Sequence, residues 1–188
     1  MVVCVFGSSG AEIDKVYVEN TEVLGEKLAL RGHSLIFGGG KFGLMGAAAR
    51  GFRKGGGFVK GVIPTFFGDY DVIYDCDEFQ WTENMRDRKK YMEDNSDAFI
   101  ITPGGIGTYE EFLEVLTLKQ LARLSKPIVV FNVNGFFDKL LSVFDDNVRD
   151  GFIREQTPEL FKVTADIDEV ISIVENDNYD IEKIKFYG

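Results

Sequence analysis

Apolar residues along this chain follow two alternating patterns. Short continuous apolar runs alternate with longer segments in which apolar positions recur every three or four residues among charges. The runs predict buried strands at 2–6, 34–37, 58–63, 98–102 and 127–131, with a shorter candidate near 72–75. The longer segments predict helices at 12–31, 43–54, 82–95, 108–124, 135–149 and 166–175. This alternation predicts an α/β fold with a doubly wound, mostly parallel sheet and helices on both faces, which is a Rossmann-like arrangement.

The chain length predicts one domain, and glycines predict where the first two helices end. We expect 188 residues to form a single nucleotide-binding domain spanning 1–188. Gly32 and the triplet at 55–57 are expected to end the first and second helices. The polar segment at 176–188 is expected to be a tail that docks on the surface or frays.

Charge and composition narrow the possible partners. The chain carries 21 basic and 31 acidic residues, a formal charge of −10, which argues against nonspecific binding of DNA or RNA. No apolar run approaches the roughly 20 residues needed to cross a bilayer, so no membrane partner is expected. Cys4 and Cys76 are isolated, and the first strand begins at once with no basic leader. We therefore expect free thiols and a cytoplasmic protein.

Three glycine turns follow predicted strands, at 7–10, 38–43 and 103–111. The last reads Pro-Gly-Gly-Ile-Gly-Thr-Tyr-Glu-Glu and opens directly into a helix. A strand, a glycine turn and a helix N-terminus in this order form an anion site, because the first helical N–H groups are unpaired and carry partial positive charge. The two glutamates, Glu110 and Glu111, could serve only the helix dipole, or one of them could act on a sugar attached to a bound phosphate.

The turn at 38–43 satisfies the spacing G-x-G-x-x-G, which is typical of dinucleotide sites. It follows the second strand rather than the first, and the next strand ends at 61–64 without an acid to hold a ribose. A phosphate turn, a close backbone approach and tight strand–helix packing all remain open for it. A Walker-type phosphate loop is absent from the sequence.

The segment at 82–90 is dense in positive charge inside an acidic protein. It could be a solvated helix face or an arginine clamp for a phosphate or carboxylate. His33 is the only histidine, so no metal site and no Ser-His-Asp triad are expected, and Ser8 and Ser9 are hydrogen-bond donors rather than nucleophiles. Four aromatic residues could wall an apolar base pocket: Phe66, Phe67, Tyr70 and Trp81.

Three stretches together resemble a known family. Residues 38–46 look like its G-G-G-x-x-G-L-M-G turn, residues 103–111 match its P-G-G-x-G-T-x-x-E signature, and residues 85–89 look like its M-x-x-R-K segment. The family is the Lonely Guy type of cytokinin riboside 5′-monophosphate phosphoribohydrolases, often labelled lysine decarboxylases. The order of motifs agrees from about residue 2 to residue 155.

The resemblance implies a Rossmann-like homodimer without a cofactor. It implies hydrolysis of the N-glycosidic bond of a nucleoside 5′-monophosphate, either AMP or an N6-modified AMP, to free base and ribose 5-phosphate. It puts catalytic roles on Arg88 and Glu111. It places Thr117 in a pocket shaped partly by the partner subunit. The substrate-binding residues that we expect are Ser8, Gly39, Gly40, Met45, Lys89, Gly105, Ile106, Gly107, Thr108, Glu110 and Thr117.

Two departures from the family pattern concern the base. The segment at 65–71 is shorter than usual, and Arg86 stands where a histidine is frequent. Other functions compete with the hydrolase: a non-catalytic carrier of nucleotide or molybdenum cofactor, and a salvage nucleosidase acting broadly on AMP, GMP and CMP. A pyridoxal decarboxylase is disfavoured because no arrangement for a Schiff-base lysine is readable.

Overall fold

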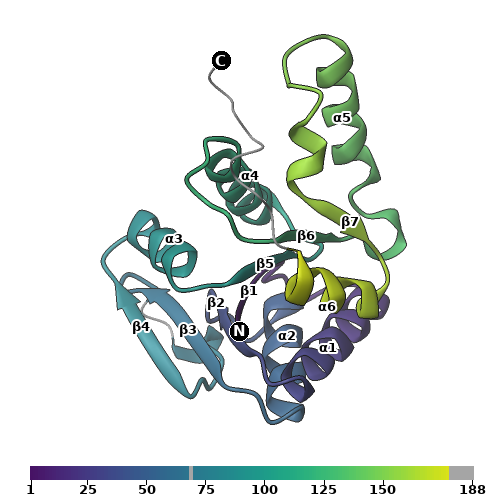
Figure 1. Cartoon of the computed structure of the whole chain (residues 1–188). Coiled ribbons are helices and arrows are strands. Elements are labelled where there is room, and N and C mark those ends of the chain that lie inside the picture. The colour runs from purple at the N-terminus through teal and green to yellow at the C-terminus, as the bar shows by residue number, and fades with distance from the viewer. Residues whose placement is uncertain (68–69, 178–188) are drawn as a thin grey trace.

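The protein is built around one parallel β-sheet, as the computed structural model shows for residues 1–67 and 70–177 (Figure 1). Within these residues the strands lie in the order β4-β3-β2-β1-β5-β6-β7, and every neighbouring pair is parallel. The predicted fold class is therefore confirmed. The strand bounds are β1 Val2–Phe6, β2 Ser34–Phe37, β3 Val59–Pro64, β4 Glu78–Thr82, β5 Ala98–Ile101, β6 Ile128–Phe131 and β7 Lys162–Thr164.

Helices cover both faces of the sheet, with α1, α2 and α6 on one face and α3, α4 and α5 on the other (Figure 1). Strand β1 illustrates why both faces need helices. Val3 and Val5 are buried on the face covered by α1, α2 and α6, whereas Cys4 and Phe6 are buried on the face covered by α3, α4 and α5. Successive strand side chains point to opposite faces, so a run that is apolar throughout needs helices on both sides. The helix bounds are α1 Lys15–Leu30, α2 Gly43–Lys54, α3 Met85–Asp94, α4 Ile106–Gln120, α5 Asp138–Arg149 and α6 Ile167–Asn176.

The chain changes direction in the sheet between β1 and β5. Strands β2, β3 and β4 follow β1 in order toward one edge of the sheet, and β5 then pairs with the other side of β1. Loops that leave the carboxyl ends of β1 and β5 are therefore neighbours, and the backbone N–H of Ser8 donates to the carbonyl of Pro103 at 3.1 Å. This switch in strand order is where open α/β sheets bind ligands.

The predicted strand near 72–75 is wrong. Residues Tyr70–Val72 form a short 3-10 helix, η1, and Ile73 makes a single antiparallel bridge to Gly40. The strand at the edge next to β3 is β4 instead, and most of its residues are exposed or partly exposed. An edge strand of this kind lacks a continuous apolar run, so its signal in the sequence is weak.

Several predicted helix boundaries shift because local caps decide them. The helix expected at 82–95 begins at Met85, since Thr82 still belongs to β4 and the Asn84 side chain accepts from the backbone N–H groups of Arg86 and Asp87. The first helix begins at Lys15 rather than 12, after the capping residue Asp14.

The ends of the first two helices agree with expectation, whereas the C-terminal region adds an element. Gly32 and Gly56 adopt positive φ angles of 82° and 75° just beyond α1 and α2. Strand β7, only three residues long, was not predicted. Helix α6 ends at Asn176, and the rest of the predicted tail, from 178 to 188, lies outside the described residues.

Helices α1 and α2 pack unusually closely. An ideal Cβ on Gly25 would lie 2.6 Å from the carbonyl oxygen of Ala48, and one on Gly51 would lie 2.1 Å from that of Glu22. Glycine at both positions lets the two backbones approach, and a side chain there would overpack the contact. No helix in the described part of the chain is both long and apolar enough to cross a membrane.

Candidate active site

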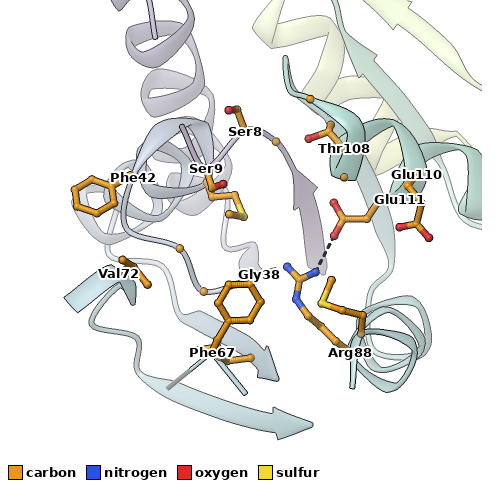
Figure 2. A pocket seen from close by; sticks show the side chains of 18 of the residues that line it. Ser8, Ser9, Gly38, Phe42, Phe67, Val72, Arg88, Thr108, Glu110 and Glu111 are labelled. Atoms are coloured by element: carbon orange, nitrogen blue, oxygen red, sulfur yellow. Dashed lines mark hydrogen bonds and ion pairs between the residues drawn. The ribbon is translucent and has the colours of Figure 1, made fainter. Parts of the chain in front are cut away.

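A cavity of about 610 Å³ opens at the carboxyl ends of the central strands (Figure 2). Its lining includes residues from all three predicted glycine turns, at 7–9, 38–40 and 105–107. The expectation that these turns converge on one crevice is therefore confirmed. Figure 2 shows Ser8 and Ser9 on one side of the cavity and Thr108 and Glu111 on the other.

The N-terminus of α4 forms an open anion cradle. Gly105 is the residue before the helix and provides no side-chain cap. Within the described residues, no acceptor receives the backbone N–H of Ile106, Gly107 or Thr108. An ideal Cβ on Gly105 or Gly107 would meet no protein atom within 4 Å, and neither residue has a positive φ angle. Neither packing nor backbone conformation requires glycine at these two positions, so they leave space for a ligand beside a positive helix end.

The N-terminus of α2, in contrast, is already occupied by protein. The carbonyl oxygen of Ser8 accepts from the backbone N–H groups of Leu44 at 2.8 Å and Met45 at 3.2 Å. Gly43 has a φ angle of 59°, and an ideal Cβ there would lie 2.4 Å from that same carbonyl oxygen. Close backbone packing therefore explains the last glycine of the 38–43 turn, and a phosphate would find the N–H groups of Leu44 and Met45 already paired with the Ser8 carbonyl.

The rest of the 38–43 turn forms a wall of the cavity. Gly39 and Gly40 line it, and the turn is held against the segment after η1. The backbone N–H of Lys41 donates to the carbonyl of Val72 at 2.9 Å, and that of Tyr74 donates to the carbonyl of Gly39 at 2.8 Å. This pairing carries Val72 into the cavity lining.

Arg88 and Glu111 meet at the cavity wall, as Figure 2 shows. The Nη1 of Arg88 lies 3.0 Å from the Oε1 of Glu111, and both side chains are about nine-tenths buried. Arg88 Nε also donates to the carbonyl of Val62 at 3.1 Å. Its Nη2 passes so close to Gly38 that an ideal Cβ there would be 1.8 Å away. Helix α3, β3 and the 38–40 turn together fix the guanidinium.

The protonation of Glu111 is set by two opposed effects. Burial raises the pKa of its carboxyl group above the ordinary value, because the charged form loses water. The Arg88 guanidinium opposes this rise by its charge and its hydrogen bond. A carboxylate that is partly desolvated yet paired with a fixed cation is typical of catalytic groups.

Lys89 occupies a different place from the one expected. Its Nζ forms ion pairs with two carboxylates of α4, those of Glu110 and Glu114, the second at 2.6 Å. It does not belong to the cavity lining. Thr117 is also outside the lining: it lies on the exposed face of α4, and its hydroxyl donates to the carbonyl of Leu113 at 2.7 Å.

The other expected substrate-binding residues do come together at the cavity. These are Ser8, Gly39, Gly40, Met45, Gly105, Ile106, Gly107, Thr108 and Glu110. Of the aromatic residues proposed for a base pocket, Phe67 lines the cavity, whereas Phe66 and Trp81 do not. The side chain of Tyr70 lies outside the described residues.

Sequence reasoning missed much of the apolar wall. Phe42, Ile63, Ile73 and Met85 also line the cavity. Phe42 and Met85 stand inside the recognised motifs and could have been found there. Ile73 reaches the cavity only through its bridge to Gly40, which no local pattern reveals.

The single histidine and the two cysteines do not line the cavity. His33 lies just before the amino end of β2, whereas the cavity opens at the carboxyl ends of the strands, and its Nε2 is 2.9 Å from Glu175 Oε1. Burial raises the pKa of both thiols, that of Cys76 to about 12, so neither is a ready nucleophile. In the described ranges, no group of three or more His, Cys, Asp or Glu residues could hold a metal ion.

Fold and site together define a class: a Rossmann-like α/β protein with an open helix N-terminus and a buried arginine–glutamate pair in one cavity. The profile of the family described as "Possible lysine decarboxylase" matches residues 45–174. A probable cytokinin riboside 5′-monophosphate phosphoribohydrolase of Oryza sativa subsp. japonica is 39% identical over 174 residues, which span 92% of this chain and 77% of the relative. The cytokinin riboside 5′-monophosphate phosphoribohydrolase LOG5 of Arabidopsis thaliana is 35% identical, over 92% and 76% of the two chains. The chain belongs to this phosphoribohydrolase family.

Solved structures support the fold at greater distance. The molybdenum cofactor binding protein of Rippkaea orientalis superposes with a TM-score of 0.72 at 21% identity, over 94% of this chain and 96% of that one. The molybdenum cofactor carrier protein of Chlamydomonas reinhardtii gives 0.68 at 23% identity, over 93% and 95%. At these identities the similarity concerns the fold alone.

Proposed function

We propose that this chain is an N-glycosidase that hydrolyses a nucleoside 5′-monophosphate to free base and ribose 5-phosphate. The observation that carries the proposal is the buried Arg88–Glu111 pair in the same cavity as the open N-terminus of α4. A cradle alone would suit any phosphate carrier. A fixed carboxylate beside the cradle supplies the group that cleavage of a sugar–base bond requires.

The two ends of the cavity differ in chemistry, and this suggests how the substrate lies. The 5′-phosphate would accept hydrogen bonds from the unpaired backbone N–H groups at the start of α4. The ribose would then lie near Glu110 and Glu111, and the base would reach the apolar wall that includes Phe42 and Phe67. This wall favours an N6-modified adenine over an unmodified one, because an apolar substituent would be buried there.

The reaction breaks the bond between C1′ of the ribose and the base nitrogen. The bond's electron pair leaves with the base, positive charge develops on the ribose ring, and water adds its oxygen to C1′ while its released proton balances the charge on the base. Glu111, as a carboxylate, would stabilise the oxocarbenium-like state or orient the water. Arg88 would hold that carboxylate in place. General acid–base help of this kind is typically worth about 10²–10⁴-fold in rate.

We also propose that the enzyme is a cytoplasmic homodimer. One face of α4, extended by the residue that follows it, carries exposed apolar residues spaced for a single stripe, namely Ile106, Leu113 and Leu121, and Thr117 lies between the last two. Ile106 is 88% exposed and also lines the cavity. A second copy seated on this stripe would stand at the mouth of the cavity and beside Thr117.

The function is tested by measuring base release from a panel of nucleoside monophosphates, nucleosides and N6-modified AMPs. We expect release of base and ribose 5-phosphate from at least one monophosphate and loss of activity on nucleosides without the 5′-phosphate. Equal turnover of AMP, GMP and CMP would indicate a broad salvage nucleosidase. Tight nucleotide binding without release of any base would reject hydrolysis and indicate a carrier.

The catalytic assignment is tested by Glu111→Gln and Arg88→Ala. Each should lower kcat by about 10²-fold or more, because each removes one partner of the charged pair. Circular dichroism and thermal unfolding verify that the variants are folded. Near-normal turnover by either folded variant would contradict the assignment.

A further inference from the structure

Lys89 is the neighbour of Arg88 on α3, yet it faces a different set of groups. Its side chain is about nine-tenths buried, and its Nζ lies between the carboxylates of Glu110 and Glu114 on α4. Lys90, the next residue, is largely exposed and pairs with Asp94 of its own helix at 2.8 Å. Two consecutive cations of α3, Arg88 and Lys89, therefore bind three carboxylates in consecutive turns of α4.

The charges around Glu111 are unbalanced. Three elements pack around it and bring charged or titratable groups: β1, α3 and α4. These groups are the Cys4 thiol on β1, Arg88 and Lys89 on α3, and Glu110 on α4, with Glu114 one turn further along α4 and paired with Lys89. The Cys4 thiol is neutral because burial raises its pKa far above the ordinary value. With Glu111 ionised, three carboxylates of α4, those of Glu110, Glu111 and Glu114, face Arg88 and Lys89, so the loss of either cation leaves a carboxylate uncompensated.

We propose that Lys89 is a positioning residue for catalysis: it neutralises Glu110 and Glu114 and so keeps the neighbouring Glu111 ionised and aligned with Arg88, rather than binding the substrate itself. This inference rests on the proposed function. It differs from the role expected from the sequence, in which Lys89 contacts the phosphate or ribose. The geometry opposes that role, since Lys89 is engaged with two carboxylates and lies outside the cavity lining.

The sign of the effect follows from the charges. Removing the positive charge of Lys89 leaves Glu110 and Glu114 uncompensated, and like charges nearby disfavour ionisation of a carboxyl group. Burial already raises the pKa of Glu111, so this loss would raise it further. Because the reaction needs the carboxylate, activity would disappear at a higher pH as the solution is acidified.

Substitutions that remove a positive or a negative charge near Glu111 test the proposal through the pH dependence of kcat/KM. Lys89→Met should move the acidic limb of the profile to higher pH by roughly 0.5 pH unit or more, because a nearby charge is lost. Glu114→Gln should move it to lower pH, because a like charge is removed next to Glu111. Lys89→Arg should keep the limb close to that of the unmodified enzyme.

Lys90→Met is the matched control. This substitution removes the same charge from the adjacent position of the same helix. Because Lys90 is exposed and faces Asp94, the acidic limb of the kcat/KM profile should not move in this variant. A general loss of positive charge from α3 would shift both methionine variants equally.

The competing role predicts another pattern. If Lys89 binds the phosphate, Lys89→Met should raise KM for the nucleotide and weaken inhibition by ribose 5-phosphate, with the acidic limb of kcat/KM unmoved. That result would overturn the proposal. If Lys89→Met does not fold, Glu114→Gln decides: an unmoved limb or a shift to higher pH overturns the proposal.

A second readout separates this proposal from the proposed function. The carboxyl carbon of Glu111, assigned in ¹³C-glutamate-labelled protein by its loss in Glu111→Gln, can be titrated by NMR in every variant. The Glu111 midpoint should rise in Lys89→Met and fall in Glu114→Gln whether or not the protein releases a base. Unchanged midpoints in an active enzyme would reject the role of Lys89 and leave the hydrolase function intact.

Discussion

At the scale of single residues, one short turn contains glycines that are needed for different reasons. An ideal Cβ on Gly104 would lie 2.0 Å from the hydroxyl oxygen of the buried Thr108, so this glycine serves packing inside the protein. Gly105 and Gly107 face open space at the cavity, where the proposed phosphate would lie. The same residue type in the sequence P-G-G-I-G-T therefore has a packing role at one position and a proposed binding role at two.

This distinction predicts opposite outcomes for two alanine substitutions. Gly107→Ala should leave the midpoint of thermal unfolding unchanged or slightly raised, since alanine favours a helix more than glycine does. It should raise KM for the nucleotide roughly tenfold or more, because its methyl group intrudes on the phosphate. Gly104→Ala should lower the free energy of unfolding by roughly 1–3 kcal/mol through overpacking against Thr108.

Thermal unfolding and steady-state kinetics on both variants check the pair. If Gly107→Ala bound and turned over the nucleotide normally, the phosphate would have to lie elsewhere in the cavity.

At the scale of elements, α6 is held against α1 and β2 by an ionic cluster. Arg31, at the end of α1, donates from Nε and Nη2 to the two carboxylate oxygens of Glu175, each at 2.6 Å. His33 contacts the same carboxylate at 2.9 Å, and Lys27 reaches Asp168 at 2.7 Å. The hydrogen bond from Arg31 is the main reason that the pKa of Glu175 is lowered to about 2.

The cluster predicts a pH-dependent contribution of Glu175 to stability. Its pKa is lower in the folded state than in the unfolded chain, so its stabilising effect is present above the unfolded pKa of about 4.3 and is lost as the pH falls toward 2. Glu175→Gln should therefore be less stable than the unmodified protein at pH 7, and the difference should vanish near pH 2.

Urea unfolding at several pH values measures this difference. Glu169→Gln is a control on the same helix, since its carboxylate faces Thr164 rather than Arg31. A stability gap for Glu175→Gln that is independent of pH would show that the ionic cluster is not its cause.

At the scale of the whole molecule, the proposed dimer interface on α4 adjoins the cavity. The stripe of Ile106, Leu113 and Leu121 is exposed in the single chain, and its first residue also lines the cavity. Exposed apolar residues in register on one helix commonly mark an interface between proteins. In the proposed dimer, this stripe is covered and Thr117 is brought close to the partner.

The dimer is tested by Leu113→Glu, which places a charge in the middle of the stripe. We expect the particle mass measured by sedimentation to fall from that of a dimer to that of a monomer, because a buried unpaired charge opposes association. Leu30→Glu is the matched control, since Leu30 is also exposed but lies at the end of α1. A monomeric unmodified protein, or a dimeric Leu113→Glu variant, would contradict the proposed interface.

The sequence by itself determined the elements whose signals are local. Buried strands such as β1 and β5 are apolar throughout, glycines end α1 and α2, and the turn at 103–111 carries its cradle and both glutamates within nine residues. These features depend on neighbours along the chain, so periodicity and turn chemistry reveal them. The resemblance of short motifs added Arg88, which no local rule connects to Glu111.

Only the tertiary structure decided which groups meet. The exposed edge strand β4 has no continuous apolar run that the sequence could reveal. Three other contacts join segments that are distant in the sequence: the bridge between Gly40 and Ile73, the capping of α2 by the Ser8 carbonyl, and the ion pairs of Lys89. Such contacts arise because parallel strands bring loops from separate crossovers to one edge of the sheet. The sequence supplied the candidate residues, and the packing of α3 against α4 separated the cation that faces Glu111 from the cation that balances its neighbours.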